Sequence, residues 1–400
     1  MATFNAANTG DWRTAGSWAE GSGYPVAGDT VIFGAGFTGT ITISQAEACA
    51  VLNLTGNGGT LAFGAQSLTI TANISLGGTI TATTGGIIMT GVDTSRIITS
   101  NGVTFPGLLT STNAKTVTLK GNLILGKGLV ISASSATVIN KTDVGDGDTL
   151  TINDATASVL TLGTALSGTT NIVIAGTGCV WSGSNNLSNN LTFNCTSATI
   201  SGRVKYIAGT LTYTAGTITT TSSTLDITGA CTLDTDRGAT KITLNNLTIS
   251  LGTYTITLSS NLTGTGMLKA GGGNSPTFSG AFDISFYEFS LASSVSSGAT
   301  VFTFPAGRTF TITNSLAITS IQAAIPETLL CTLKSSSTSN PFYLNYTGTL
   351  ANCKVFGTTF TDVDASGSSI PIYNWYGGTL TRTTNIINVT ASNIGGIFIQ

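Results

Sequence analysis

One short pattern recurs along most of this 400-residue chain: an apolar residue, a threonine and a second apolar residue. In an extended chain successive side chains point to opposite faces, so each copy predicts a short strand with an apolar face and a threonine face. Turns rich in Gly, Asn and Ser separate the copies, as at 56–59 and 264–266. The repeat therefore predicts an all-β protein. Copies of the pattern lie, among other places, at 41–43, 68–70, 117–119, 150–152, 211–213, 256–258 and 310–312.

Chain length selects among all-β architectures. A single sandwich or barrel of this length would be unusually large, whereas each coil of a solenoid buries its apolar face only against its neighbours. We therefore predict a single-stranded β-helix, a parallel β-solenoid with three short strands per coil. Coils of about 20–25 residues over about 320 residues give roughly 14 coils and a rod about 65 Å long. Asn53 and Asn73, and then Asn101 and Asn122, are about one coil apart, which suggests asparagine ladders in stacked turns.

The first 35 residues have a different composition from the repeats. A solenoid exposes the edge of its first strand, which must be covered to prevent edge-to-edge pairing. Trp12 and Trp18 can cover the open end of an apolar column, and Asp29 can accept backbone N–H groups in a turn. We predict an aromatic N-terminal cap at 1–35, a solenoid at 36–355, and a C-terminal β cap and assembly segment at 356–400.

Composition excludes several classes of function. Charged residues make up 8% of the chain, the net charge is −2, and there is no histidine. A nucleic-acid partner would need a basic surface, and a membrane helix would need about 18 consecutive apolar residues. Histidine-based triads and metal sites are impossible. We accordingly expect no cofactor, no bound metal, no nucleic acid and no membrane.

The six cysteines predict buried free thiols, since they form no CxxC pair and are too sparse for a disulfide scaffold. Cys331 and Cys353 lie about one coil apart, which is compatible with a disulfide without requiring one. The first residues lack a basic segment followed by an apolar one, so we expect no Sec export and folding in a reducing cytosol. The six positions are Cys49, Cys179, Cys195, Cys231, Cys331 and Cys353.

Asp143, Asp146 and Asp148 lie in a Gly-rich segment that has two interpretations. Their oxygens suit Ca²⁺, but the segment lacks a full EF-hand loop and repeated calcium nonapeptides. We favour a solvated turn.

Two further acidic pairs are candidates for glycoside hydrolysis, which needs two carboxylates about 5–10 Å apart. Asp234 and Asp236 share one face of an extended segment, but pairing with Arg237 is the simpler interpretation. Asp362 and Asp364 have the same spacing in a turn-like segment, where Asx-turn capping of a final coil is the simpler interpretation. We therefore expect no enzyme.

Aromatic residues gather near the C-terminus at Tyr373, Trp375 and Tyr376. Sugars stack on exposed aromatic faces, which would make this group a carbohydrate-binding patch. Tyr and Trp are also enriched at protein interfaces, so a hydrophobic plug or subunit contact is the interpretation that we favour. Further aromatic residues lie upstream at Phe342, Tyr343 and Tyr346.

Charge is absent from two long stretches, between Glu47 and Asp93 and between Asp154 and Arg203. A surface with so little charge is poorly protected against association. We infer that copies of this chain or other proteins cover much of it in the mature state. The uncharged segment 393–400 could add a strand to a neighbour.

Both ends of the chain resemble β-helix proteins found among bacteriophage structural proteins and bacterial surface passengers. The similarity covers about 50 residues, and the middle of the chain matches by composition and repeat. At the N-terminal end it rests on the pattern Trp12-x5-Trp18-x5-Tyr24-Pro25-x2-Gly28-Asp29-x-Val31-x-Phe33, followed by 40–43. At the C-terminal end it rests on 360–367, followed by Pro371, Ile372 and Tyr373.

With the sparse charge, this resemblance implies a structural protein of a phage virion, assembled in the host cytoplasm. We expect a capsid decoration (cement) protein or a short fibre that forms a homo-oligomer, a trimer in our interpretation. Its partners would be other virion proteins such as the major capsid protein, and host surface polysaccharide is a further candidate. One alternative is a tailspike-like receptor-binding protein or polysaccharide depolymerase that uses an Asp pair. The other is a bacterial surface adhesin, which requires an export route.

Overall fold

Over its described residues the chain is an all-β parallel solenoid of about 14 turns, which confirms the predicted fold class. The helical segments in this part of the chain are two short 3₁₀ turns, Ala15–Ser17 and Leu350–Asn352. The computed structural model describes residues 1–56, 58–90, 96–112, 116–132, 137–141, 148–220, 223–234, 236–237, 240–241, 248–271, 273–293, 299–320, 331–375 and 379–389.

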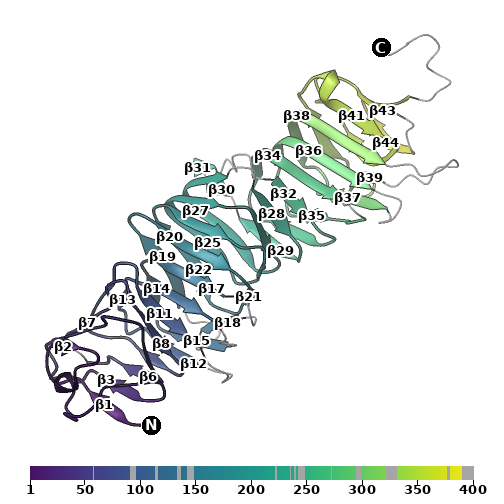
Figure 1. Ribbon diagram of the computed structural model, residues 1–400. Helices are drawn as coiled ribbons and strands as arrows, with labels where there is room; N and C mark the ends of the chain where they lie inside the picture. The colour runs from purple at the N-terminus through teal and green to yellow at the C-terminus, as the bar shows by residue number, and fades with distance from the viewer. Residues whose placement is uncertain are drawn as a thin grey trace. The chain divides into compact units, whose positions relative to one another are not determined.

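Contacts divide the chain into two compact units. Unit 1 comprises Met1–Val204 and Ala215–Thr217, and unit 2 comprises Lys205–Thr214 and Ile218–Gln400. Within each unit, strands of successive coils lie side by side (Figure 1). Strands β26 (Arg203–Tyr206) and β27 (Thr210–Thr220) contain the boundary.

Unit 1 has three columns of parallel strands. Column A contains β1 (Thr3–Asn5), β3 (Thr30–Ile32), β6 (Val51–Asn53), β9 (Ile74–Ser75), β12 (Arg96–Thr99), β15 (Thr116–Lys120), β18 (Thr137–Lys141), β21 (Leu166–Ser167) and β24 (Asn186–Leu187). Column B contains β5 (Glu47–Cys49), β8 (Ser67–Ile70), β11 (Gly86–Met89), β14 (Leu108–Ser111), β17 (Gly128–Ile131), β20 (Ser158–Leu162) and β23 (Cys179–Ser182). Column C contains β2 (Gly10–Asp11), β4 (Thr40–Thr42), β7 (Thr60–Ala62) and β10 (Thr79–Thr81), and a second run of β13 (Thr104–Phe105), β16 (Leu123–Leu125), β19 (Thr149–Asp154) and β22 (Asn171–Gly176). The long strand β25 (Leu191–Ile200) continues columns C and B in turn.

Unit 2 also has three parallel columns, in which several long strands bend to serve two. Column D contains β28 (Thr224–Ile227), β32 (Thr248–Leu251), the later parts of β34 (Leu262–Gly271), β36 (Ile284–Ser293) and β38 (Thr309–Ser320), and then β41 (Cys353–Phe356), β43 (Ile372–Trp375) and β45 (Ile386–Val389). Column E contains β29 (Cys231–Asp234), β33 (Thr255–Leu258), β35 (Thr277–Ser279), β37 (Thr300–Phe304), β39 (Cys331–Ser335) and the earlier parts of β42 (Thr358–Asp364) and β44 (Leu380–Thr384). Column F contains the remaining parts of these long strands and β40 (Phe342–Tyr346). A short antiparallel pair joins β30 (Asp236–Arg237) to β31 (Thr240–Lys241).

Apolar residues stack in register from coil to coil inside each unit. In column A, Leu52 pairs with Ile74 and Ile74 pairs with Ile98, and all three side chains are almost fully buried. The coils vary in length, and the one that joins Val138 to its partner Ser167 is longer than these two. Since parallel pairing places each residue beside its counterpart, the alternation of one strand is repeated through the column.

The four asparagines expected to form ladders bond backbone groups, three of them on another coil, rather than one another. The Ile97 N–H donates to Asn73 Oδ1 at 3.0 Å, and the Thr149 N–H donates to Asn122 Oδ1 at 2.9 Å. Asn101 donates to the Leu76 carbonyl at 2.6 Å, whereas Asn53 accepts from Thr55 in its own turn. The expected ladders of asparagine side chains are therefore replaced here by bonds that satisfy backbone groups where the strands end.

The aromatic cap predicted at the N-terminal end is present. Trp12 and Trp18 are buried with their ring centroids 5.3 Å apart in an edge-to-face arrangement. Their indole N–H groups donate to the carbonyls of Pro25 and Trp12, at 3.1 and 2.8 Å. As predicted, Asp29 accepts backbone N–H groups, from Ala2 at 2.7 Å and Val26 at 3.1 Å.

Replacing Trp18 by alanine is predicted to destabilise unit 1 strongly, because the ring is 2% exposed and packs edge-to-face on Phe4, Trp12 and Phe33. Loss of a buried aromatic ring costs about 3–5 kcal/mol. Urea denaturation followed by tryptophan fluorescence measures this change. Val26→Ala is the control, since Val26 is 52% exposed and its truncation should leave the transition nearly unchanged.

Candidate assembly surface

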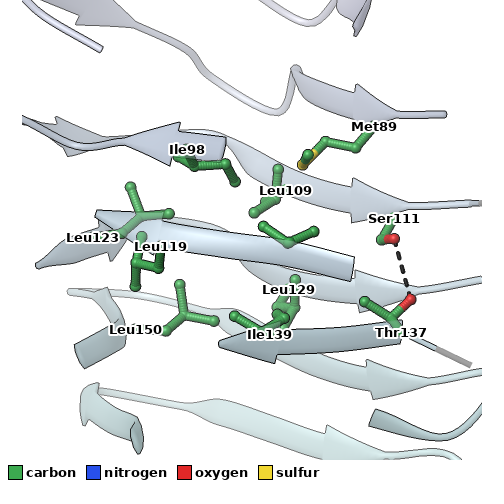
Figure 2. A pocket seen from close by; sticks show the side chains of 11 residues that line it. Met89, Ile98, Leu109, Ser111, Leu119, Leu123, Leu129, Thr137, Ile139 and Leu150 are labelled. Atoms are coloured by element: carbon green, nitrogen blue, oxygen red, sulfur yellow. Dashed lines mark hydrogen bonds between the residues drawn. The ribbon is translucent and has the colours of Figure 1, made fainter. Parts of the chain in front are cut away.

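The cavity that the structure describes between the columns of unit 1 is too small to be a binding site. Figure 2 shows a cavity between the columns, lined by aliphatic side chains with the hydroxyls of Ser111 and Thr137 at one edge, 3.2 Å apart. The cavity volume is about 10 Å³. This is the lower limit for a single water molecule, so no ligand of any size fits in it.

The Gly-rich Asp segment, for which we favoured a solvated turn over a Ca²⁺ site, lies mostly outside the described residues, because Asp143 and Asp146 are not among them. Asp148 accepts a hydrogen bond from the Gly121 N–H at 2.9 Å, which joins two coils. In the described part of the chain, no three His, Cys, Asp or Glu side chains gather closely enough to hold a metal ion. Nor does any helix there have the length and apolarity needed to span a membrane.

The two acidic pairs occupy different settings. Asp234 ends β29, but the side chains of Asp236 and Arg237 lie outside the described residues. Asp362 is 3% exposed, has a φ of 54°, and accepts both a bidentate pair of bonds from Arg382 and the Ser339 N–H at 3.1 Å. The left-handed backbone at Asp362 interrupts the strict alternation of the strand at this point.

Asp364 bonds locally, as the turn interpretation predicts. Its Oδ1 accepts the Ser366 N–H at 2.9 Å, two residues further along the chain. This is an Asx-turn. The carboxylates of Asp362 and Asp364 thus each have a structural partner, one in Arg382 on β44 and one in the backbone that follows β42.

The predicted aromatic residues Tyr373 and Trp375 lie on the outer face of β43. Parallel register places Trp375 between Phe356 of β41 and Val389 of β45, and places Tyr373 beside Ile387. Phe356 is 37% and Ile387 is 44% exposed, and the other three are half-buried. We name these five residues the C-terminal ladder. Tyr376, the third predicted residue, and the uncharged segment 393–400 lie outside the described residues.

The upstream aromatic residues are not part of the C-terminal ladder. Phe342 and Tyr346 are fully buried, and the Tyr346 hydroxyl donates to the carbonyls of Asn314 and Thr349. Tyr343 is 43% exposed, but it lies on column F. The aromatic residues near the C-terminus therefore lie in three places: the core, the outer face of column F and the C-terminal ladder.

A buried asparagine holds the strand that carries the ladder. Asn374 is 0% exposed and donates to the Thr358 carbonyl at 2.7 Å and to Asn388 Oδ1 at 2.9 Å, while its Oδ1 accepts the Thr358 N–H at 3.2 Å. Its side chain points inward, so strand alternation directs Tyr373 and Trp375 outward. The register of the ladder is thus fixed by polar bonds beneath it.

Sequence reasoning missed Phe356, Ile387 and Val389. The signal for them is the pairing register, in which Phe356 meets Trp375 and Trp375 meets Val389. The coils that join these pairs are shorter than predicted and differ from each other in length, so the sequence alone does not align the three residues. Chemically, the resulting surface offers apolar and aromatic contact, with Lys354 of β41 as an exposed charge nearby.

All six cysteines are buried free thiols, as predicted. Burial raises the pKa of Cys353 to about 11 and that of Cys49 to about 12. Because the thiolate is the reactive form, these thiols are poor nucleophiles at neutral pH.

We found no match of this chain to a protein-family model, to a curated protein or to a solved structure.

The Asp362–Arg382 ion pair predicts that unit 2 loses stability in acid. Bonds from Arg382, and then from Ser339, lower the pKa of Asp362 in the folded protein. The unfolded chain therefore binds more protons, and the stabilisation is complete above about pH 4 and lost as the pH falls toward the lowered pKa. Asp362→Asn should lower the urea midpoint at pH 6 and remove part of the loss of stability below about pH 4.

The fluorescence of Trp375 measures the unfolding of unit 2 in variants whose other tryptophans are replaced by phenylalanine. Asp364→Asn is the matched control, since Asp364 bonds only a neutral backbone N–H among its described contacts. An unchanged acid response in Asp362→Asn would contradict the assignment of the pH dependence to this pair.

Proposed function

We propose that this chain is a non-enzymatic structural protein of a bacteriophage particle. It would be a capsid decoration (cement) protein or a short fibre, and its copies would associate into a trimer. The C-terminal ladder carries this proposal, because it presents five apolar or aromatic side chains in register on the outside of consecutive strands. Contiguous exposed apolar surface of this kind is typical of protein contacts.

Two further observations support an assembly role. The segments that resemble phage β-helix proteins lie at the aromatic cap and beside the ladder, at 12–33 and 360–373. The charge-free stretches of unit 1 also fold into solenoid coils, so their outward side chains are largely Thr, Ser, Asn and aliphatic residues. In a symmetric assembly, burial of such faces adds stability through association.

The C-terminal ladder also favours one rival function, a tailspike-like contact with host polysaccharide. Half-exposed Tyr373 and Trp375 offer ring faces on which sugars stack. We favour a protein contact because the flanking ladder residues Ile387 and Val389 are aliphatic and offer no hydrogen bonds to sugar hydroxyls. Binding of host polysaccharide by the purified protein, lost on Trp375→Ala, would support the rival.

Replacing Phe356 by serine is predicted to convert the trimer to monomers at low protein concentration, because it removes the most exposed ring of the apolar contact. Sedimentation velocity measures the change. Tyr343→Ser is the matched control, since Tyr343 has similar exposure on column F and its loss should leave the oligomer intact. An oligomer that survives Phe356→Ser unchanged would contradict a contact through the C-terminal ladder.

The location of the chain tests the wider proposal. Cryo-electron microscopy of purified virions should show solenoids in symmetric clusters on the capsid or tail. Absence of the chain from particles would refute the proposal, as would release of new reducing ends or unsaturated products from host polysaccharide.

A further inference from the structure

The outer face of column B in unit 1 is a flat surface without charged side chains. It consists of the outward residues of six consecutive strands, which pair in register from coil to coil. Aliphatic residues, glycines and small polar residues are mixed over it, and none of them is charged. We name this surface the column B face, and its residues are Ser67, Thr69, Gly86, Ile88, Leu108, Thr110, Gly128, Val130, Val159, Thr161, Val180 and Ser182.

The residues between these positions form the core. Leu109, Leu129 and Leu160 are nearly or fully buried, whereas Thr110 and Val130 beside them are half-exposed. Strand alternation thus separates an inner apolar ladder from an outer ladder that meets solvent. Five of the twelve residues of the outer ladder are aliphatic.

Among the described residues, the charged side chain that directly precedes a strand of this face points away from it. Lys127 directly precedes β17, but its ammonium group pairs with Asp154 at the end of β19 in column C. In column A, by contrast, the exposed Lys120 lies at the end of β15. The column B face therefore lacks the charges that protect a flat β-surface from association.

We propose that the column B face packs against the same face of a second copy of this chain. An uncharged face has no electrostatic complement on a charged partner, and it does not repel its own copy. The rows of side chains on this face repeat at the spacing of parallel strands, about 4.8 Å, and the face of another parallel solenoid has the same repeat. A two-fold axis parallel to the stacking direction sets each coil opposite the same coil, so that the outer ladders interdigitate.

The area of the face determines how strong this pairing is. Six strands at about 4.8 Å and four residues at about 3.3 Å give a flat area of about 29 by 13 Å, or about 380 Å² per copy. This is about half of the roughly 800 Å² per partner in a stable complex. The pairing is consequently weak and concentration-dependent, and it becomes effective where copies are held close together, as on a particle. The statement that copies are held close together on a particle rests on the proposed function.

Thr110→Lys tests the pairing in the full-length chain. Thr110 is half-exposed on β14, between Ile88 and Val130. Thr118→Lys is the matched control, because Thr118 is a half-exposed threonine in β15 on the outer face of column A. Both variants carry Phe356→Ser, so the C-terminal ladder contributes nothing to the association that is measured.

Sedimentation equilibrium over a range of concentrations is expected to show a weak dimer for Phe356→Ser alone and with Thr118→Lys. Thr110→Lys should weaken that dimer at least tenfold. A mixture of Thr110→Lys and Thr110→Asp chains should recover it as a heterodimer, because opposite charges then meet across the two-fold axis. Recovery distinguishes self-pairing from loss of folding in either variant.

Several outcomes would overturn the inference. These are a Phe356→Ser protein that remains monomeric up to its solubility limit, equal association of the two lysine variants, or a mixture that fails to recover the dimer. The proposed function has a separate test. If Phe356→Ser leaves a trimer intact, the ladder contact is wrong, while the comparison of Thr110→Lys with Thr118→Lys still decides the column B face.

Discussion

In-register parallel pairing between coils is the constraint on which the rest of this structure depends. Each strand forms hydrogen bonds to the strand one coil away. A residue that points inward therefore lies beside another inward residue, as Leu52 lies beside Ile74 and Ile74 beside Ile98. An apolar residue inside one coil therefore needs an apolar residue inside the next. The same rule acts outside, where it turns isolated outward residues into continuous ladders. Core and surface consequently both follow from one alternation.

The corners make this pairing possible. At Gly128 the backbone has a φ of 108°, and an added Cβ would lie 2.0 Å from the carbonyl oxygen of Val159 on the next coil. A larger residue would push the coils apart at that point. Where strands end, side chains replace the lost ladder bonds, as Asn73 does for the N–H of Ile97. Glycine and asparagine thus have separate roles, one allowing close approach and the other satisfying backbone donors.

The sequence predicts those features that depend on local alternation and on residue type. The short strands, the tryptophan cap and the buried thiols follow from such patterns. The C-terminal ladder does not, because it depends on which residues meet across two coils of unequal length. Asp362 is a second feature that the sequence did not predict, because its ion-pair partner Arg382 lies on the next coil and not in its own segment. Coil register is a long-range property, and one chain without a strict period does not encode it visibly.

The first strand of unit 1 and its column B face differ in how they are protected against pairing with another chain. At the free edge of β1 the Ala19 N–H donates to the Asn5 carbonyl at 2.8 Å, and the Glu20 carboxylate accepts the Asn5 N–H at 3.1 Å. Those backbone groups are therefore unavailable to another chain, and a negative charge marks the edge. The column B face has no comparable charge or cover among its strand residues. Under the proposed pairing, protection of Asn5 at this edge and an uncharged side would favour lateral contact, and so closed assemblies, over end-to-end growth at this edge.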